Sequence, residues 1–389
     1  MNIVLLSPRN DLTGNRKLLT LFARELGAKH VVRMLYPLIP DRLLLRNSIR
    51  PVSWLGYGRK IAADLLRYVA HPRWMFTSLL PSARVSIRPY WSALTAQDLA
   101  DADVVLYCSP YQALELAEIP KGRAVRIFYA MHDQSRTDGH VIAVERILAA
   151  YRTGDHRIAL SEETRGHLAE RGVSCEAVIP AGVDIEVFYP APKPHEGPPK
   201  LLGYYWPGEP RKGADVLWEA LQQIRARHPE VRVSLLTPPG VRVPGVRTFS
   251  SLSEEELAQL YRAHDIFIYP NTHGGGFGLP PLEAMASGCG VVATTVGAIG
   301  DYARHEDSAL LCTPGDAGQL VKSVQRLVQQ PQLLAAIRIR AVQEARRWSW
   351  QHAAERLERY LAGLVCQSAG SVSLAEEVVQ YSGHAEKGA

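Results

Sequence analysis

A proline-rich stretch near the middle of the chain constrains its fold more than any other feature. Residues 190–200 hold five prolines in eleven positions, and prolines at that density exclude a helix or a central strand. The stretch therefore predicts a semi-rigid linker. A length of 389 residues favours two or three domains, and one linker close to halfway along the chain favours two.

Apolar strand patterns alternate with helical patterns on both sides of this linker. Before it, the strand candidates are residues 2–7, 104–107, 124–129 and 157–160. Beyond it, strands are expected at 200–204, 231–236, 266–269 and 290–294, and helices at 214–226, 253–264 and 280–287. Such alternation is typical of a parallel sheet in a doubly wound α/β domain. Two similar halves joined by a linker predict a ligand cleft between them.

Composition excludes several broad classes of protein. With 47% apolar and 21% charged residues, the chain is neither disordered, collagen-like nor a disulfide scaffold. Five cysteines without C-x-x-C spacing predict reduced thiols and argue against structural zinc. No stretch reaches the roughly 18 apolar residues of a spanning helix, and the apolar run at 3–6 is too short for a signal peptide. We therefore expect a soluble, intracellular protein.

The loop at 7–14 carries one glycine, so the dinucleotide fingerprint of an oxidoreductase is missing.

The densest chemical signal is residues 273–288, which read HGGGFGLPPLEAMASG. Four glycines in five positions let a backbone approach a ligand without interference from Cβ atoms. Pro280 and Pro281 suit the first turn of a helix, whose N–H groups and positive dipole end favour an anion at the loop. Glu283, expected in that first turn, is suited to accepting two hydroxyl hydrogen bonds, as from a ribose. The alternative is a tight turn in which Glu283 only compensates the helix dipole.

A basic triplet, residues 211–213, follows the strand expected at 200–204. Arg211 offers a planar fork and Lys212 a point charge, which suit a diphosphate whose negative charge grows as it leaves. The alternative is an ordinary basic surface turn. Its place between a strand and a helix favours the phosphate role.

Together these segments resemble the retaining GT-B glycosyltransferases of family 4, over roughly residues 1–365. The family pattern E-x-F-G-L-P-x-x-E-A-M-A-x-G is matched at 277–280, 283–286 and 288. Residues 179–190, which read IPAGVDIEVFYP, match another family segment before the linker. Two positions depart from the pattern: Gly275 replaces the first glutamate, for which His273 is a candidate substitute, and Tyr204 stands where the family often has an arginine.

The resemblance implies a set of site residues. His132 ends a buried strand at its carboxyl edge and would contact the donor sugar; the alternative is a surface histidine followed by a helix-capping Asp133. Ser161 is expected to cap a helix. The implied roles are catalytic for His132, Arg211 and Lys212; donor-binding for His273, Gly274, Gly275, Gly276, Phe277, Gly278, Leu279 and Glu283; and acceptor-side for Arg9 and Gly14.

The fold and function implied by the resemblance follow from these roles. The fold is α/β of the GT-B type, with two Rossmann-like domains facing across a cleft and a C-terminal helix that crosses back to the first domain. The expected parts are an acceptor domain at 1–189, the linker at 190–200, a nucleotide-sugar domain at 201–350, a crossover helix at 351–366 and a flexible tail at 367–389. The activity implied is metal-independent, retaining transfer of a sugar from a nucleotide-diphosphate sugar to a hydroxyl of a glycan, lipid-linked or small-molecule acceptor, without a further cofactor. The alternatives are a nucleotide-sugar epimerase and a non-catalytic binding subunit.

The net charge of +5 is local rather than general. Residues 41–91 hold nine basic and two acidic side chains, a balance of 9 − 2 = +7, interleaved with seven aromatic ones. This composition suits contact with an anionic membrane, which would place a cytoplasmic protein at the inner face of the cytoplasmic membrane. The alternative is a solvated basic helix with ordinary core aromatics. No nucleic-acid module is visible, and the oligomeric state is left open.

Two further patterns are interpreted as structural. Asp101 and Asp103 have the D-x-D spacing of metal-dependent transferases, but they directly precede a buried strand, so no metal site is predicted. Cys289 also precedes a buried strand and is expected in the core rather than as a nucleophile.

Overall fold

The computed structural model describes residues 1–8, 14–37, 83–90, 93–133, 135, 143–192, 197–274 and 276–368. Arg9, Gly275, most of the basic segment at 41–91 and the tail from 369 lie outside the described residues. The chain divides into two compact units. Unit 1 contains Met1–Ala159, Arg165–Ile179 and Ala353–Ala389, and unit 2 contains Leu160–Thr164 and Pro180–His352.

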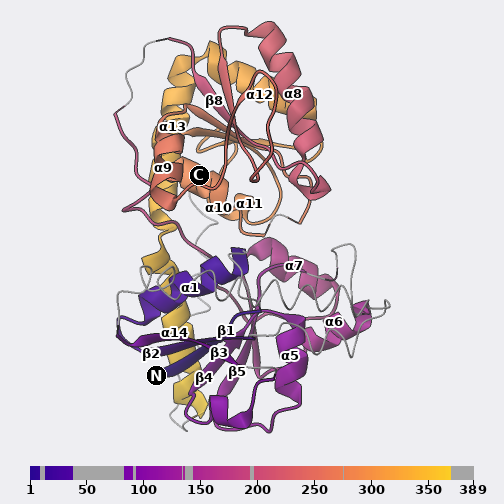
Figure 1. Ribbon diagram of the computed structural model, residues 1–389, viewed down its shortest axis with the longest axis vertical. Helices are drawn as coiled ribbons and strands as arrows, with labels where there is room; N and C mark the ends of the chain where they lie inside the picture. The colour runs from indigo at the N-terminus through magenta and orange to yellow at the C-terminus, as the bar shows by residue number, and fades with distance from the viewer. Residues whose placement is uncertain are drawn as a thin grey trace, which may run out of the picture. The chain divides into compact units, whose positions relative to one another are not determined.

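Unit 1 is built around a parallel sheet whose described strands follow the order β3-β2-β1-β4-β5-β6-β7. Its helices alternate with the strands along the chain (Figure 1). The elements before residue 190 are β1 (Asn2–Leu6), α1 (Gly14–Leu26), β2 (Val31–Pro37), β3 (Val85–Tyr90), η1 (Ala96–Leu99), β4 (Val104–Tyr107), α5 (Pro110–Ala117), β5 (Val125–Ala130), α6 (Val144–Tyr151), β6 (His156–Ala159), α7 (Glu162–Glu170) and β7 (Ala177–Val178).

Unit 2 repeats this plan with a parallel sheet in the order β10-β9-β8-β11-β12-β13. Helix α8 packs beside α12, and α10 packs beside α9 and α13 (Figure 1). The elements from residue 200 onward are β8 (Lys200–Tyr204), η3 (Pro210–Lys212), α8 (Ala214–Arg227), β9 (Arg232–Leu236), β10 (Arg247–Phe249), α9 (Glu254–Arg262), β11 (Ile266–Tyr269), α10 (Leu279–Ala286), β12 (Gly290–Thr294), α11 (Ile299–Tyr302), β13 (Leu310–Cys312), α12 (Ala317–Gln329), α13 (Pro331–Arg347) and α14 (Trp350–Ser368).

Both sheets reverse their winding direction once. In unit 1 the reversal lies between β1 and β4, and in unit 2 it lies between β8 and β11. Loops that leave the carboxyl ends of two such strands diverge to opposite faces, which opens a crevice suited to ligands. The topology therefore points to the loops after β8 and β11 in unit 2.

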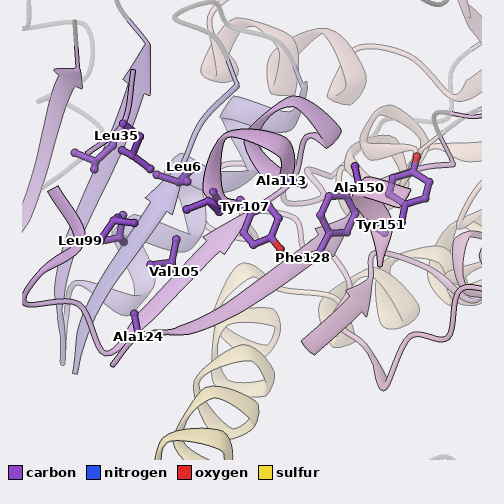
Figure 2. Packing of buried hydrophobic residues seen from close by; sticks show 14 of the residues in the cluster. Leu6, Leu35, Leu99, Val105, Tyr107, Ala113, Ala124, Phe128, Ala150 and Tyr151 are labelled. Carbon is purple, nitrogen blue, oxygen red and sulfur yellow. The ribbon is translucent and has the colours of Figure 1, made fainter. Parts of the chain in front are cut away.

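One hydrophobic cluster of unit 1 lies between its sheet and the helices α5 and α6. Figure 2 shows Val105 and Phe128 of the sheet near Ala113 of α5 and Tyr151 of α6. The Phe128 ring lies 5.1 Å from that of Tyr151 and 5.4 Å from that of Tyr107, centroid to centroid. The first contact packs α6 on the sheet, and the second joins the neighbouring strands β4 and β5.

The C-terminal helix α14 starts in unit 2 and belongs to unit 1 from Ala353 onward, as the resemblance implied. Glu358 on this helix bonds to Lys29 Nζ at 2.9 Å and to His30 Nε2 at 3.0 Å. The Tyr360 hydroxyl donates to Glu176 at 2.9 Å. The helix reaches Ser368, two residues into the tail predicted from 367. Across the described residues, no helix is both long and apolar enough to cross a membrane.

Candidate functional site

The loops after β8 and β11 are bonded to each other at the reversal point of unit 2. The backbone N–H of Thr272 donates to the Arg211 carbonyl at 2.9 Å, and the Thr272 hydroxyl donates to the Pro210 carbonyl at 3.2 Å. The basic triplet and the start of the glycine loop, separated by some sixty residues in sequence, are thus one structural unit.

Gly213 permits this close approach. Its φ is +64°, a left-handed conformation that L side chains rarely adopt. A Cβ atom at this position would lie 2.0 Å from the Pro270 carbonyl oxygen, far inside van der Waals contact. The glycine of the triplet is therefore required by the fit of one backbone against another.

Arg211 is held by a carboxylate that the sequence analysis missed. Its Nε and Nη2 atoms both donate to one oxygen of Glu209, at 3.2 and 3.0 Å, and its Nη1 donates to the Gly274 carbonyl at 3.4 Å. Both side chains of the pair remain 42% exposed. The opposite charges two residues apart were the available signal.

Lys212 lies deeper than Arg211, with its ammonium 5.4 Å from the centroid of the Tyr204 ring. The Tyr204 ring also stacks on Trp206, with centroids 4.6 Å apart and an interplanar angle of 12°, and its centroid lies 5.1 Å from that of Tyr269. Tyr204 stands where the family that the sequence resembles often has an arginine, and its ring contacts the Lys212 ammonium. Burial, with the nearby Arg211 charge, lowers the pKa of Lys212 to about 8, against the attraction of Glu209.

The glycine loop leads into α10, whose N-cap is Gly278 with a φ of +77°. Because prolines follow at 280 and 281, only Leu279 among the first three helical residues keeps an N–H group. A Cβ atom at Gly274 or Gly276 would meet nothing within 4 Å, so the described loop backbone is open to a ligand.

The side chains beside the loop divide into an exposed one and a buried one. His273 is exposed, and its Nδ1 lies 3.0 Å from the Thr272 hydroxyl. The Phe277 ring is buried, with its centroid 5.5 Å from that of Tyr302 and 6.0 Å from that of Trp348. Of these two side chains, only His273 faces solvent.

Glu283 lies in the second turn of α10, because the helix begins at Leu279; the prediction of a first-turn position is wrong. The residue is 4% exposed, and its carboxylate accepts a hydrogen bond of 3.5 Å from the Tyr261 hydroxyl. Burial raises the pKa of Tyr261, and the Glu283 charge raises it further. Because Glu283 lies beyond the first turn of α10, its position does not support a role in compensating the helix dipole. Its carboxylate is instead a buried hydrogen-bond acceptor.

Asn271 is a second polar residue that the sequence analysis missed. It is fully buried at the end of β11, where its Nδ2 donates to the Tyr269 hydroxyl at 2.8 Å. Its Oδ1 has no hydrogen-bond partner among the described residues. A buried amide so close to the loop was not signalled by any pattern in the sequence.

Of the remaining predicted residues, Gly14 and His132 lie in unit 1 and Ser161 lies in unit 2. His132 follows β5 at the carboxyl edge of the sheet and is partly buried. Asp133 accepts bonds from the N–H and hydroxyl of Ser135 at 2.9 and 2.6 Å, a local side-chain to backbone contact that is compatible with the capping alternative. Gly14 begins α1. Ser161 caps α7 as predicted, since its hydroxyl oxygen accepts from the Thr164 N–H at 3.1 Å.

The two patterns interpreted as structural have structural contacts. Asp103 accepts from the Asn2 N–H at 2.7 Å and pairs with Arg123 at 3.2 Å, at the amino end of β4. Cys289 is buried, with its Sγ bonded to the Tyr261 carbonyl at 3.1 Å. No group of three or more His, Cys, Asp or Glu within the described ranges is arranged to hold a metal ion.

The arrangement in unit 2 is suited to a polyanion with hydroxyl groups. Arg211 and Lys212 supply positive charge beside an open backbone loop, and Glu283 supplies a buried acceptor on the helix that this loop enters. Cationic forks and helix N-termini are the groups that proteins use for phosphates.

Comparisons with known proteins agree with this geometry. Residues 201–330 match the family described as Glycosyl transferases group 1. The chain is 30% identical over 236 residues to a phosphatidyl-myo-inositol mannosyltransferase of Mycolicibacterium smegmatis, covering 56% of this chain and 61% of that protein. It is 31% identical over 208 residues to a D-inositol 3-phosphate glycosyltransferase of Thermobispora bispora, covering 46% and 48%. The chain thus spans about half to three fifths of these curated relatives.

Solved structures share the fold along nearly the whole chain. A sucrose-phosphate synthase of Thermosynechococcus elongatus superimposes with a TM-score of 0.66 at 17% identity, covering 94% of this chain and 99% of that one. Anabaena HepE, solved with UDP and glucose, gives a TM-score of 0.68 at 16% identity, covering 93% and 100%. The α/β fold with two parallel sheets is therefore that of the GT-B glycosyltransferases, as the resemblance implied.

Proposed function

We propose that this chain, which carries a Glycosyl transferases group 1 domain at 201–330 on a GT-B fold, transfers a sugar from a nucleotide-diphosphate sugar to a hydroxyl acceptor. The observation that carries this proposal is the joining of Arg211 and Lys212 to the loop after β11 at the reversal point of the sheet. The relatives named above support transfer and give no support to an epimerase or a non-catalytic subunit.

In the proposed mechanism, the two cations stabilise the diphosphate as its negative charge grows on departure from the sugar. The open backbone at Gly274 and Gly276 positions the sugar, and Glu283 accepts hydroxyls of the nucleotide. His132 contacts the sugar from the acceptor domain, to which Arg9 and Gly14 also belong. Transfer is retaining and needs no metal ion.

The acceptor domain corresponds to residues 1–189 and the nucleotide-sugar domain to residues 201–350, with the linker at 190–200. The basic segment at 41–91 is proposed to contact an anionic membrane.

A panel of donors and acceptors tests this function. Because Anabaena HepE binds UDP-glucose and a curated relative is a mannosyltransferase, the panel contains UDP- and GDP-sugars. We expect one class of donor to raise the melting temperature, and the same donor to be consumed only when a hydroxyl acceptor such as inositol phosphate or a phosphatidylinositol vesicle is present. NMR of the product then gives its anomeric configuration, and EDTA tests metal independence. Donor isomerised without acceptor, or no donor bound at all, would contradict the proposal.

The pKa of Lys212 predicts a pH dependence of nucleotide binding. The protonated ammonium binds the diphosphate, so affinity should be constant below pH 8 and fall as pH rises through about 8, by up to about tenfold per pH unit. Burial raises the pKa values of Tyr204 and Tyr269, so these hydroxyls do not titrate in that window. Calorimetric titration with UDP or GDP between pH 7 and 9.5 measures the effect. An affinity that stays constant over this range would show that Lys212 does not contact the diphosphate.

A further inference from the structure

We propose that the Glu209 carboxylate competes with the donor diphosphate for the Arg211 guanidinium, and so limits affinity for both donor and nucleotide product. The inference rests on the function proposed above. Arg211 directs Nε and Nη2 at one Glu209 oxygen, while its Nη1 lies at the Gly274 carbonyl. The edge of the guanidinium that is best suited to a phosphate is therefore occupied by an anion of the protein itself.

A carboxylate and a phosphate present similar oxygen atoms to a guanidinium edge, and one such edge holds one bidentate partner at a time. A diphosphate that takes the Nε and Nη2 donors of Arg211 must displace Glu209, or bind by Nη1 and Lys212 alone. The pair is 42% exposed on both sides, so it is the kind of ion pair that is cheap to break. A diphosphate can accordingly displace Glu209 from Arg211.

The backbone that carries Arg211 is held independently of this ion pair. Thr272 bonds to the carbonyls of Arg211 and Pro210, and Gly213 fits against Pro270. Neutralising Glu209 therefore removes the competing charge without removing the supports of the loop. This separation allows the two possible roles of Glu209, competing for Arg211 and positioning it, to be distinguished by experiment.

Competition of this kind acts equally on substrate and product. Removing it should strengthen binding of the donor and of the released nucleoside diphosphate, which lowers KM without raising kcat. Where product release limits turnover, kcat should fall, because the carboxylate no longer returns to displace the product.

The test is Glu209→Gln, with Glu219→Gln as its control. Glu219 is an exposed glutamate on α8, so its substitution makes the same change in net charge away from the fork. The probes are UDP and GDP alone, titrated calorimetrically at pH 7, where Lys212 stays mostly protonated even though loss of Glu209 removes an attraction that raises its pKa. We expect the Kd of the bound nucleotide to fall about three- to tenfold in Glu209→Gln and to be unchanged in Glu219→Gln.

A double variant, Arg211→Ala with Glu209→Gln, tests whether the effect passes through Arg211. We expect the gain from Glu209→Gln to shrink to less than about twofold in that background. Weaker binding by Glu209→Gln would show that Glu209 positions Arg211, and unchanged binding would show that the fork does not meet the diphosphate; either overturns the inference while the function stands. Failure of the wild-type protein to bind any nucleotide removes the function and the inference together.

Discussion

Replacing Lys212 with methionine should abolish most transfer and at the same time stabilise the fold. Loss of a cation that meets a developing phosphate charge typically costs about a hundredfold or more in turnover. The pKa of about 8, in place of the ordinary 10.5, corresponds to about 3 kcal/mol of unfavourable charging in the folded protein. Methionine fills the same apolar path without that charge, so the free energy of unfolding should rise by up to this amount.

The sign of the stability effect provides its own check. Because the pKa of Lys212 is lower in the folded protein than in the unfolded chain, the destabilisation is fully present below pH 8 and disappears as pH rises to 10.5. The difference in unfolding free energy between Lys212→Met and wild type should therefore be largest at pH 7 and vanish above pH 10.5. Denaturant unfolding at several pH values and steady-state kinetics measure the two effects.

Lys322→Met is the matched control, since Lys322 is exposed on α12. It should change neither turnover nor stability by more than a few tenths of a kcal/mol. A Lys212→Met protein with near-normal kcat/KM would refute the phosphate role. One that is less stable than wild type would show that the contact of the ammonium with the Tyr204 ring outweighs its burial.

The strands of the sheet centres were predictable because each is a short apolar run flanked by helical periodicity. The bounds of β4, β8, β11 and β12 agree with the predicted ranges to the residue. The strands β2, β3, β7, β10 and β13 were not predicted. Of these, β7, β10 and β13 have only two or three residues, too few to show a period. The burial of a central strand is visible in its own sequence as an apolar run. The formation of a short edge strand depends instead on pairing partners far away in the chain.

The helix starts show which local signals are reliable. The helix predicted from residue 253 begins with a capping box of Ser253 and Glu256, in which both hydrogen bonds are formed; such a signal depends only on residues three apart. For α10, the two prolines correctly marked the first turn of the helix. The helix was predicted to begin at residue 280 but begins at Leu279, so Glu283 lies in the second turn rather than the first.

Roles that depend on contacts distant in sequence could not be deduced from residue spacing. Gly182 lies in the segment whose sequence resembles that of the family, yet the structural requirement for glycine is that a Cβ atom there would lie 2.4 Å from the Trp350 backbone nitrogen. The ion pair of Glu209 with Arg211 was local and could have been predicted. The burial of Asn271 and the stacking of Trp206 on Tyr204 depend on the assembled sheet, which no spacing shows.

Substituting Gly213 with alanine should disrupt the site more severely than any other change of similar size. The new Cβ would face the Pro270 carbonyl oxygen at 2.0 Å, and neither backbone can yield without moving the loop after β11 or the turn that carries Lys212. A left-handed alanine adds about 1–2 kcal/mol and the overlap about 1–3 kcal/mol, so the free energy of unfolding should fall by about 2–5 kcal/mol. Nucleotide affinity should fall more than about tenfold as Arg211 and Thr272 separate.

Gly208→Ala separates the overlap from the backbone conformation. Gly208 lies in the same connection with a φ of +89°, but a Cβ atom there would meet nothing within 4 Å. This control should therefore cost only about 1–2 kcal/mol and leave nucleotide affinity unchanged. Calorimetric titration and denaturant unfolding of both variants decide the matter: equal losses of affinity would mean that the contact of Gly213 with Pro270 does not position the cations, and a loss confined to Gly213→Ala would make that contact the support on which they depend.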